Sequence, residues 1–278
     1  MNIALACLWE ATARKVGNVH PAASFADMEY FDFVKSGLAL EEAWREPAAN
    51  LGERIAQGVT ASRAAVGKNT NLGIVLLLAP LLDHPRITLK TVLVKTTVED
   101  ARELYRAIRI ASPGGLGDAS EQDVHTEPTC TLVEAMALAA DRDMIAKQYA
   151  NGFTEVFQFG VPAFTAALAE FQCIEAAIVE CQLRWLAEFP DSLIARKNGS
   201  DIARGVQQRA VEVLRLGGVR SPQGRAAGVA LDRELRSNGH SLNPGTTADL
   251  VTACLFAALR EDKVNTKLPF RWNVPDWL

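Results

Sequence analysis

The chain has 278 residues, of which 49% are hydrophobic and 22% are charged, a composition that is typical of folded globular proteins and argues against disorder. The formal net charge of −4 excludes a global basic field of the kind that binds nucleic acid or an anionic membrane surface. The sequence holds no apolar run of about 18 residues and no basic segment before its apolar start, so neither a membrane-spanning helix nor a secretory signal is expected.

Apolar residues recur at helical spacing along most of the chain, which predicts an all-α protein. The expected helices are residues 2–14, 27–45, 51–66, 72–82, 97–110, 131–148, 164–189, 202–216, 226–237 and 243–259. Residues 88–96 are rich in β-branched side chains and fit a strand on pattern alone. We assign them to a helix because no partner strand is visible.

Local signals fix several ends of these helices. Thr97 is expected to be the N-cap of its helix, and Asn243 is expected to cap the last one, with Pro244 at the first helical position. Residues 112–118 read as a Gly-rich loop over the site, and residues 269–278 as an extended strap. The prediction is one domain over residues 1–278, a multi-helix bundle with buried apolar central helices.

The five cysteines are scattered and form no C-x-x-C pair. This pattern favours reduced, buried thiols in a cytoplasmic protein. The four histidines are scattered as well, which gives no support to a zinc site.

Polar residues gather in two places. Lys15, Asn18 and His20 surround Gly17, and Asp27 follows soon after. The segment 67–73 places Asn69, Thr70 and Asn71 directly before an apolar run that reads as a buried helix. Polar side chains at the start of a buried helix are typical of a ligand site, so we expect the two segments to form two walls of one pocket.

These segments, with two later ones, resemble elements of the triphosphoribosyl-dephospho-CoA synthase family. Lys15-x-Gly17 matches the family's Pro-Lys-Pro-Gly, and Asp27-Met28 matches its Asp-Met. Gly67-x-Asn69-Thr70-x-x-Gly73 matches Gly-Val-Asn-Thr-His-Lys-Gly, and Asp191-Ser192 with Ala195 and Lys197 is similar to Asp-Thr-Asn-Val-Ala-Ser-Arg. The segment 243–250 matches Ser-Pro-Gly-Gly-Ser-Ala-Asp-Leu.

The sequence departs from the family in two places. Arg14 and Val16 replace the prolines, and Asn71-Leu72 stands where the family carries His-Lys. The chain is more similar to a divergent branch found in archaea and in bacteria with tetrahydromethanopterin-linked one-carbon metabolism.

The resemblance implies a Mg²⁺-dependent transferase. It would cleave the N-glycosidic bond of ATP, release adenine and move the triphosphoribosyl group to the 2′-hydroxyl of 3′-dephospho-CoA. Such a step passes through an oxocarbenium-like state, as in glycoside hydrolysis. It requires a carboxylate to activate the acceptor hydroxyl and cations to neutralise phosphate.

Each expected site residue has a simpler alternative. Asp27 and Asp249 are expected to be catalytic residues and metal ligands. Alternatively, Asp27 only caps a helix, and Asp249 only interacts favourably with the dipole at the start of its helix. Asp191 and Glu10 are further candidates for metal ligands. Alternatively, Asp191 caps a helix, and Glu10 is an exposed acid at the end of the first helix. The nucleotide and phosphate contacts are expected from Lys15, Gly17, Asn18, His20, Asn69, Thr70, Asn71, Arg196 and Lys197.

The alternatives for the binding residues are ordinary structural roles. These roles are solvated cations for Lys15, Arg196 and Lys197, a structural histidine for His20, and helix capping for Asn18 and the three residues 69–71.

Three classes of function stay open. The first is the transferase, acting on dephospho-CoA or on a related acceptor of pterin cofactor synthesis. The second is a hydrolase of ribosylated nucleotides, and the third is a non-catalytic helical scaffold. Only small-molecule partners are expected, with no nucleic acid and no membrane, and the sequence leaves a homodimer open.

Overall fold

The computed structural model describes residues 2–83, 86–113, 121–274 and 277–278. Over these ranges the secondary structure is helical, apart from one isolated bridge between His20 and Ala23. The prediction of an all-α fold is therefore confirmed. Among the described helices none is long and apolar enough to cross a membrane. The Gly-rich segment of the predicted loop, residues 114–117, lies outside the described residues.

Contacts between residues divide the chain into two compact units. Unit 1 is built from residues 31–155, and unit 2 combines residues 4–30 with residues 156–278. The expectation of one domain over the whole chain stays a prediction.

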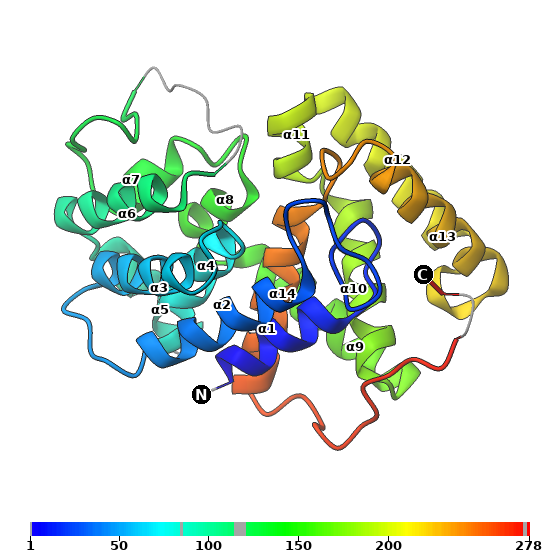
Figure 1. Ribbon diagram of the computed structural model, residues 1–278. Helices are drawn as coiled ribbons and strands as arrows, with labels where there is room; N and C mark the ends of the chain where they lie inside the picture. The colour runs from blue at the N-terminus through cyan, green and yellow to red at the C-terminus, as the bar shows by residue number, and fades with distance from the viewer. Residues whose placement is uncertain (1, 84–85, 114–120, 275–276) are drawn as a thin grey trace. The chain divides into compact units, whose positions relative to one another are not determined.

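Among its described residues, unit 1 contains the helices α2 to α8 (Figure 1). They are α2 (Tyr30–Ala43), α3 (Leu51–Val66), α4 (Leu72–Asp83), α5 (Arg86–Val94), α6 (Val98–Ala111), α7 (Leu132–Ala137) and α8 (Met144–Asn151). The segment with β-branched residues is helical in α5, as expected. Helix α4 is almost wholly buried between residues 73 and 81, which confirms a buried apolar helix in this part of the chain.

The packing of α3 on α6 explains two of the sequence signals. Thr97 and Asp100 form a reciprocal capping box at the start of α6, as predicted from Thr97. The Asp100 carboxylate also accepts a hydrogen bond of 2.8 Å from the Gly52 amide of α3. A Cβ atom on Gly52 would lie only 2.5 Å from the Asp100 backbone. Glycine at this position therefore lets the two helices approach closely.

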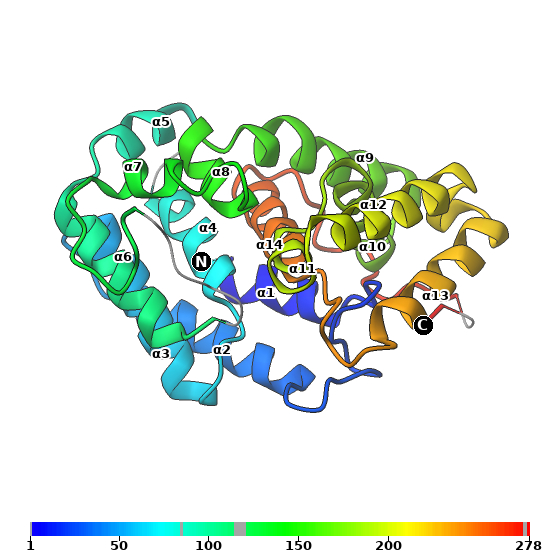
Figure 2. The same cartoon turned by 90° about the horizontal axis from the view of Figure 1, so that it is seen from above.

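Unit 2 contains the remaining helices (Figure 2). They are α1 (Ile3–Thr12), a π-helix at Val156–Gly160, α9 (Val161–Phe171), α10 (Ile174–Glu188), α11 (Ser192–Asn198), α12 (Ser200–Arg215), a 3₁₀ turn at Gly218–Arg220, α13 (Pro222–Arg236) and α14 (Gly245–Arg260). Helix α14 packs against α9, α10 and α11. Twelve of its sixteen residues are buried.

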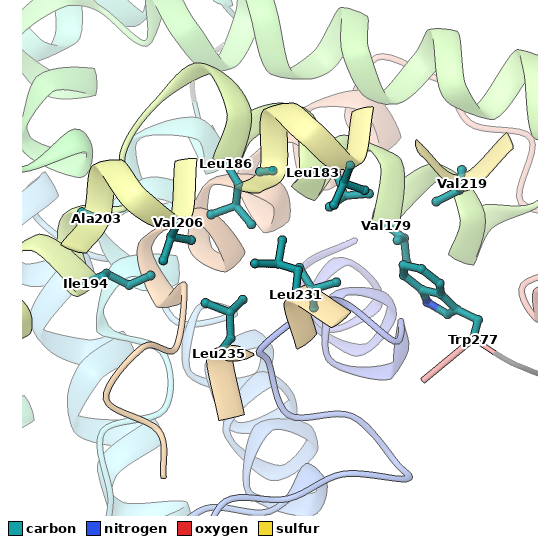
Figure 3. Packing of buried hydrophobic residues seen from close by; sticks show 13 residues of the cluster. Val179, Leu183, Leu186, Ile194, Ala203, Val206, Val219, Leu231, Leu235 and Trp277 are labelled. Carbon is teal, nitrogen blue, oxygen red and sulfur yellow. The ribbon is translucent and has the colours of Figure 1, made fainter. Parts of the chain in front are cut away.

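A hydrophobic core joins α10, α12 and α13 (Figure 3). Leu183 of α10, Val206 of α12 and Leu231 of α13 belong to it, together with Trp277 of the C-terminal tail. Burying one such side chain stabilises a protein by about 1.5–3 kcal/mol. Trp277 lies over Gly228 of α13, where an added Cβ would come within 2.5 Å of the indole. The tail is thus packed as a strap, in agreement with the prediction.

Two predicted helices are each two helices in the structure. The segment 131–148 breaks into α7 and α8 because Asp143 caps a new helix, accepting hydrogen bonds from the amides of Ile145 and Ala146. The segment 164–189 breaks at Gln172, whose φ of 49° is left-handed. Helix α10 can begin immediately afterwards because tail carbonyls accept hydrogen bonds from its first two amides.

Two expected helix starts were also wrong. Helix α2 begins at Tyr30 rather than near Asp27, because residues 25–28 form a turn closed by hydrogen bonds between Phe25 and Met28. Asn243 is not the cap of the last helix. Helix α14 begins at Gly245 after Pro244, and the Asn243 side chain instead accepts a hydrogen bond from Asn18.

Candidate functional site

The loop that follows α1 is held in place by buried polar side chains of α10 and α13. Gln182 of α10 is fully buried, and its amide accepts from the Val16 N–H at 3.0 Å and donates to the Val16 carbonyl at 2.8 Å. The Gly17 N–H donates to Asp232 of α13 at 2.7 Å. Because the Val16 and Gly17 amides both have buried side-chain partners, the protein itself fixes the conformation of this part of the loop.

Gly17 is required by this conformation. Its φ is +70°, which disfavours every other residue, and a Cβ atom would lie 2.7 Å from a methyl group of Leu235 and 3.0 Å from Pro244. From the sequence, Gly17 was expected to contact the nucleotide or its phosphates, which stays a prediction. In the structure, the close approach is to the protein's own side chains.

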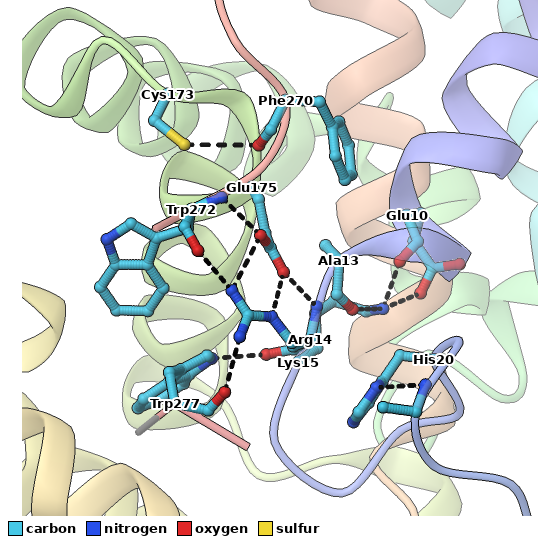
Figure 4. A network of polar contacts seen from close by, with 11 residues as sticks. Glu10, Ala13, Arg14, Lys15, His20, Cys173, Glu175, Phe270, Trp272 and Trp277 are labelled. Atoms are coloured by element: carbon cyan, nitrogen blue, oxygen red, sulfur yellow. Dashed lines mark hydrogen bonds and ion pairs between the residues drawn. The ribbon is translucent and has the colours of Figure 1, made fainter. Parts of the chain in front are cut away.

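Lys15 is buried and fully engaged (Figure 4). Its ammonium lies 2.8 Å from the Glu10 carboxylate and also donates to the carbonyl oxygens of Glu10 and Ala13. These three acceptors match the three N–H donors of a lysine. Both simple alternatives are therefore wrong, since Lys15 is not a solvated cation and Glu10 is not an exposed acid. Contact of Lys15 with phosphate stays a prediction and would require this pair to separate.

Arg14 connects the same loop to the C-terminal strap (Figure 4). Its guanidinium bonds to Glu175 at 2.6 Å and to the carbonyls of Trp272 and Trp277, each at 2.7 Å. Burial opposes ionisation of Glu175, but the hydrogen bonds from Arg14 and the Trp272 amide hold the pKa of its carboxyl below the ordinary value. The arginine that replaces a family proline thus anchors the strap.

Asn18 links three elements of unit 2. Its side chain accepts from Gln182 at 2.8 Å and donates to Asn243 at 2.7 Å, while its carbonyl accepts from Arg236 of α13. Arg236 also pairs with Asp232 at 2.9 Å. The structure therefore brings the first motif and the Asn243 motif into direct contact, which their separation in sequence could not show.

His20 is 1% exposed. Its Nδ1 atom accepts a hydrogen bond of 3.3 Å from the Ala22 amide, and its Nε2 atom has no hydrogen-bond partner among the described residues. Burial, reinforced by the nearby charges of Arg236, Lys15 and Arg14, lowers the pKa of His20 from 6.5 to about 3. The imidazole is therefore neutral in the folded protein at ordinary pH.

Asp27 lies on the surface of unit 2, with 58% of its side chain exposed and an oxygen 3.4 Å from Nδ1 of His240. The His240 ring packs against Phe25 with 5.4 Å between ring centroids, and the Arg236 guanidinium lies 5.9 Å from the Phe25 centroid. His240 and Arg236 were missed by the sequence reasoning, because neither belongs to a family element and only the fold brings them beside Phe25.

Asp191 is buried and serves as the cap of α11, as its simpler alternative stated. One oxygen accepts from the amides of Leu193 and Ile194, and the other accepts from the amide and hydroxyl of Thr247, both at 2.8 Å. Burial raises the pKa of Asp191, although these hydrogen bonds oppose the shift. The Asp191 motif is thus connected by hydrogen bonds to the start of α14.

Arg196 and Lys197 lie exposed in the last turn of α11. The pKa of Lys197 is lowered by partial burial and by Arg196, while Asp27 and Asp191 act in the opposite direction. The next residue, Asn198, donates a hydrogen bond of 2.8 Å to the carbonyl of Ser241. The end of α11 is therefore close to both Asp27 and the loop before α14. Asp249 is half-buried in the early part of α14.

The second polar segment lies in unit 1, at the start of α4. Asn69 caps the helix by accepting from the Leu72 amide at 3.2 Å, as its alternative stated, and buried Asn71 donates to Ser62 of α3 at 3.0 Å. The Thr70 hydroxyl is buried without a hydrogen-bond partner in the described ranges. Lys68 pairs with Asp32 of α2 at 2.8 Å. The two expected walls thus belong to different units, and their union in one pocket stays a prediction.

The carboxylates expected to bind metal differ in availability. Over the described part of the chain, no three His, Cys, Asp or Glu side chains form a metal-binding group. Glu10 is paired with Lys15, and both oxygens of Asp191 accept hydrogen bonds. Of the four candidates, Asp27 has an exposed side chain and Asp249 is half-buried. The five cysteines are free thiols, and four of them are buried as expected, whereas Cys130 is only partly buried.

The chain is similar in sequence to proteins of known description. A protein of Pseudomonas syringae pv. syringae (strain B728a), described as a 2-(5''-triphosphoribosyl)-3'-dephosphocoenzyme-A synthase, is 29% identical over 153 residues, which cover 49% of this chain and 52% of that protein. A Citrobacter koseri protein of the same description is 29% identical over 107 residues, or 38% of this chain and 35% of that protein. The chain spans about half the length of the first of these relatives.

A solved structure and a family comparison extend the likeness over more of the chain. The crystal structure of an Archaeoglobus fulgidus protein described as a triphosphoribosyl-dephospho-CoA synthase shares the fold, with a TM-score of 0.64 and 26% identity over 81% of this chain and 97% of that one. The sequence model of the family described as ATP:dephospho-CoA triphosphoribosyl transferase matches residues 2–267. The chain therefore belongs to the triphosphoribosyl-dephospho-CoA synthase family.

Proposed function

We propose that the protein transfers the triphosphoribosyl group of ATP to the 2′-hydroxyl of 3′-dephospho-CoA and releases adenine. The observation that carries this proposal is the family match over residues 2–267. The geometry of unit 2 supports it, because three separated motifs of the family resemblance meet there through the contacts of Asn18 with Asn243 and of Asp191 with Thr247.

The reaction needs a base at the acceptor hydroxyl. We assign this role to Asp27, whose exposed carboxylate lies beside His240 and near Lys197. The acceptor oxygen would form a bond to the anomeric carbon of the ribose while the bond from that carbon to adenine breaks. The hydroxyl proton would pass to the carboxylate, and the departing adenine nitrogen would take a proton from water. Carboxylates act in this way in the related chemistry of glycoside cleavage.

We assign Mg²⁺ bound to the phosphates of ATP to Asp27 and Asp249, because these two of the four expected carboxylates are not fully buried. Magnesium in nucleotide sites commonly takes one or two protein carboxylates, with its other ligands from phosphate and water. Asp27 and Asp249 are the candidates, and the ion would neutralise phosphate charge. The engaged oxygens of Glu10 and Asp191 make them poorer ligands. Lys197 and Arg196, at the end of α11, are suited to the remaining phosphate charge.

Adenine release tests the proposal directly. The protein is incubated with ATP, Mg²⁺ and dephospho-CoA, and free adenine and the coupled product are measured by chromatography. We expect both products in equal amounts. Asp27→Asn should lower the rate by about 100-fold or more, because a general base contributes roughly 10²–10⁴-fold. Asp201→Asn is a matched control, since Asp201 is 93% exposed in α12 and outside the site elements.

The outcomes separate the other classes of function. Adenine formed at the same rate without an acceptor would favour the hydrolase. No adenine from folded protein would overturn the transferase with these substrates. The Asn71-Leu72 sequence in place of the family's His-Lys allows a different donor or acceptor. The resemblance to the branch with tetrahydromethanopterin-linked metabolism suggests a related acceptor from pterin cofactor synthesis. A screen of such acceptors for ATP-dependent adenine release tests it.

A further inference from the structure

The hydrogen bonds of His20 define which nitrogen carries its proton. The Ala22 amide is a donor, so Nδ1, which receives its hydrogen bond, is the unprotonated nitrogen. In a neutral imidazole the proton then lies on Nε2. That nitrogen is a hydrogen-bond donor, and it cannot act as a base. Figure 4 shows the ring and its contact with the backbone of the following turn.

The Nε2–H group lacks an acceptor. It is buried, and no hydrogen-bond partner for it exists among the described residues. A buried donor without a partner costs about 1–3 kcal/mol, so folded proteins rarely retain one. The turn that fixes the ring, closed by hydrogen bonds of 2.9 and 3.0 Å between His20 and Ala23, holds the unsatisfied nitrogen in this orientation.

The surroundings of the ring favour an anionic acceptor. Arg236 of α13 and Lys15 and Arg14 of the preceding loop are the cations whose fields reach His20, and Glu175 of α10 is the acid that does so. Arg14 and Glu175 form an ion pair with each other, and Arg236 bonds to Asp232 and to the carbonyl of Asn18. Lys15 is paired with Glu10, so each of the three cations has a carboxylate partner. Their combined influence on the ring still exceeds that of Glu175, and an anion near the ring would meet it together with a neutral N–H donor.

We propose that His20 is a substrate-binding residue that donates its Nε2–H, from a neutral imidazole, to a phosphate oxygen. The proposal rests on the proposed function, because the phosphates are then the triphosphate of ATP or the diphosphate of dephospho-CoA. Since the nitrogen is buried, the ligand reaches it through a local rearrangement of unit 2. The role differs from that of a cationic phosphate ligand, as the imidazole contributes a hydrogen bond and no charge.

Two substitutions separate this role from a purely structural one. His20→Gln retains an N–H donor near the position of Nε2 and loses the acceptor for Ala22. His20→Asn retains an acceptor near the position of Nδ1 and loses the distal donor. Dissociation constants are measured by calorimetry for ATP, dephospho-CoA and tripolyphosphate, after circular dichroism has shown that each variant is folded. His20→Met, which loses both groups, replaces the Asn variant if that variant does not fold.

We expect His20→Asn, or His20→Met, to weaken binding roughly 10- to 100-fold, which corresponds to a hydrogen bond to a charged group. His20→Gln should stay within about threefold of the wild type on the same scale. Weakening for ATP and tripolyphosphate assigns the contact to the triphosphate, and weakening for dephospho-CoA alone assigns it to the diphosphate.

Equal affinities in all variants would overturn the proposal, as would better binding by the Asn variant than by the Gln variant. Failure of the folded wild type to bind any of the three ligands would overturn it as well. A wild type that binds these ligands but releases no adenine would remove the proposed reaction, while the difference between the variants would still establish the contact.

Discussion

The buried pair of Lys15 and Glu10 gives the sharpest test of what Lys15 does. Their side chains are 0% and 6% exposed, and the ammonium also satisfies the carbonyls of Glu10 and Ala13 at the end of α1. Removing one partner of a buried ion pair typically costs about 3–5 kcal/mol, because the other charge stays buried without compensation. Lys15→Met should therefore lower the free energy of unfolding by about that amount.

The measurement is urea denaturation followed by circular dichroism, in a double-mutant cycle with Glu10→Gln. The double variant should be more stable than Lys15→Met alone, since it leaves no unpaired charge. Arg45→Met is the control, because Arg45 pairs with Glu42 on the surface, with 62% and 70% of the two side chains exposed. Its effect should stay below about 1 kcal/mol. A Lys15→Met protein as stable as the wild type, but with weakened ATP binding, would refute the structural role and favour a direct phosphate contact.

Three further predictions concern unit 2 and its matched control in unit 1. In urea denaturation, Gly17→Ala should destabilise the protein by about 2–4 kcal/mol, because it adds both backbone strain and a steric clash. Gly67→Ala is the control, since Gly67 has a similar φ of +69° but open space around it. It should destabilise the protein by only about 1–2 kcal/mol. Equal losses would show that the clash is relieved. Asp191→Ala should destabilise by about 2–4 kcal/mol, since it removes a cap and the bonds to Thr247, and Asp191→Asn should recover part of this loss in the same assay. The pKa of His20 falls from 6.5 in the unfolded chain to about 3 in the folded protein, so the unfolded state binds more protons between these values and stability is lost as the pH falls from 6.5 towards 3. His20→Gln should flatten the dependence of unfolding free energy on pH in that window, and an unchanged slope would contradict the assigned burial.

The sequence predicted most of the helices because their signals are local. Thr97 caps α6 and Asp191 caps α11 with hydrogen bonds to amides only two or three residues away. The errors in helix boundaries arose where residues distant in sequence determine where a helix begins or ends. The break before α10 depends on carbonyls of residues 269 and 270, and no local pattern near Gln172 announces them. Apolar periodicity continues across that break, so it predicted one long helix.

The same division applies to the candidate site. The polar character of residues 15–20 was visible in the sequence, but their burial was not. Lys15 was interpreted as a solvated or phosphate-binding cation, because a sequence does not show that the chain turns after α1 and brings Lys15 back to the Glu10 carboxylate. Arg236 and His240 could not be identified as neighbours of Phe25, since their positions follow from the packing of α13 and of the loop before α14.

The discontinuous composition of unit 2 has a consequence for how the protein folds. Residues 4–30 belong to the same compact unit as residues 156–278. The bonds of Arg14 to Trp272 and Trp277 span 258 and 263 positions. During synthesis, unit 1 can therefore fold before residues 156–278, which α1 contacts in unit 2, have been made. If the 125-residue segment 31–155 folds first, it replaces a long flexible loop between residues 30 and 156 by a compact unit. The chain then loses less entropy when residues 4–30 contact residues 156–278. Attachment of the strap to Arg14 would then follow the folding of unit 1.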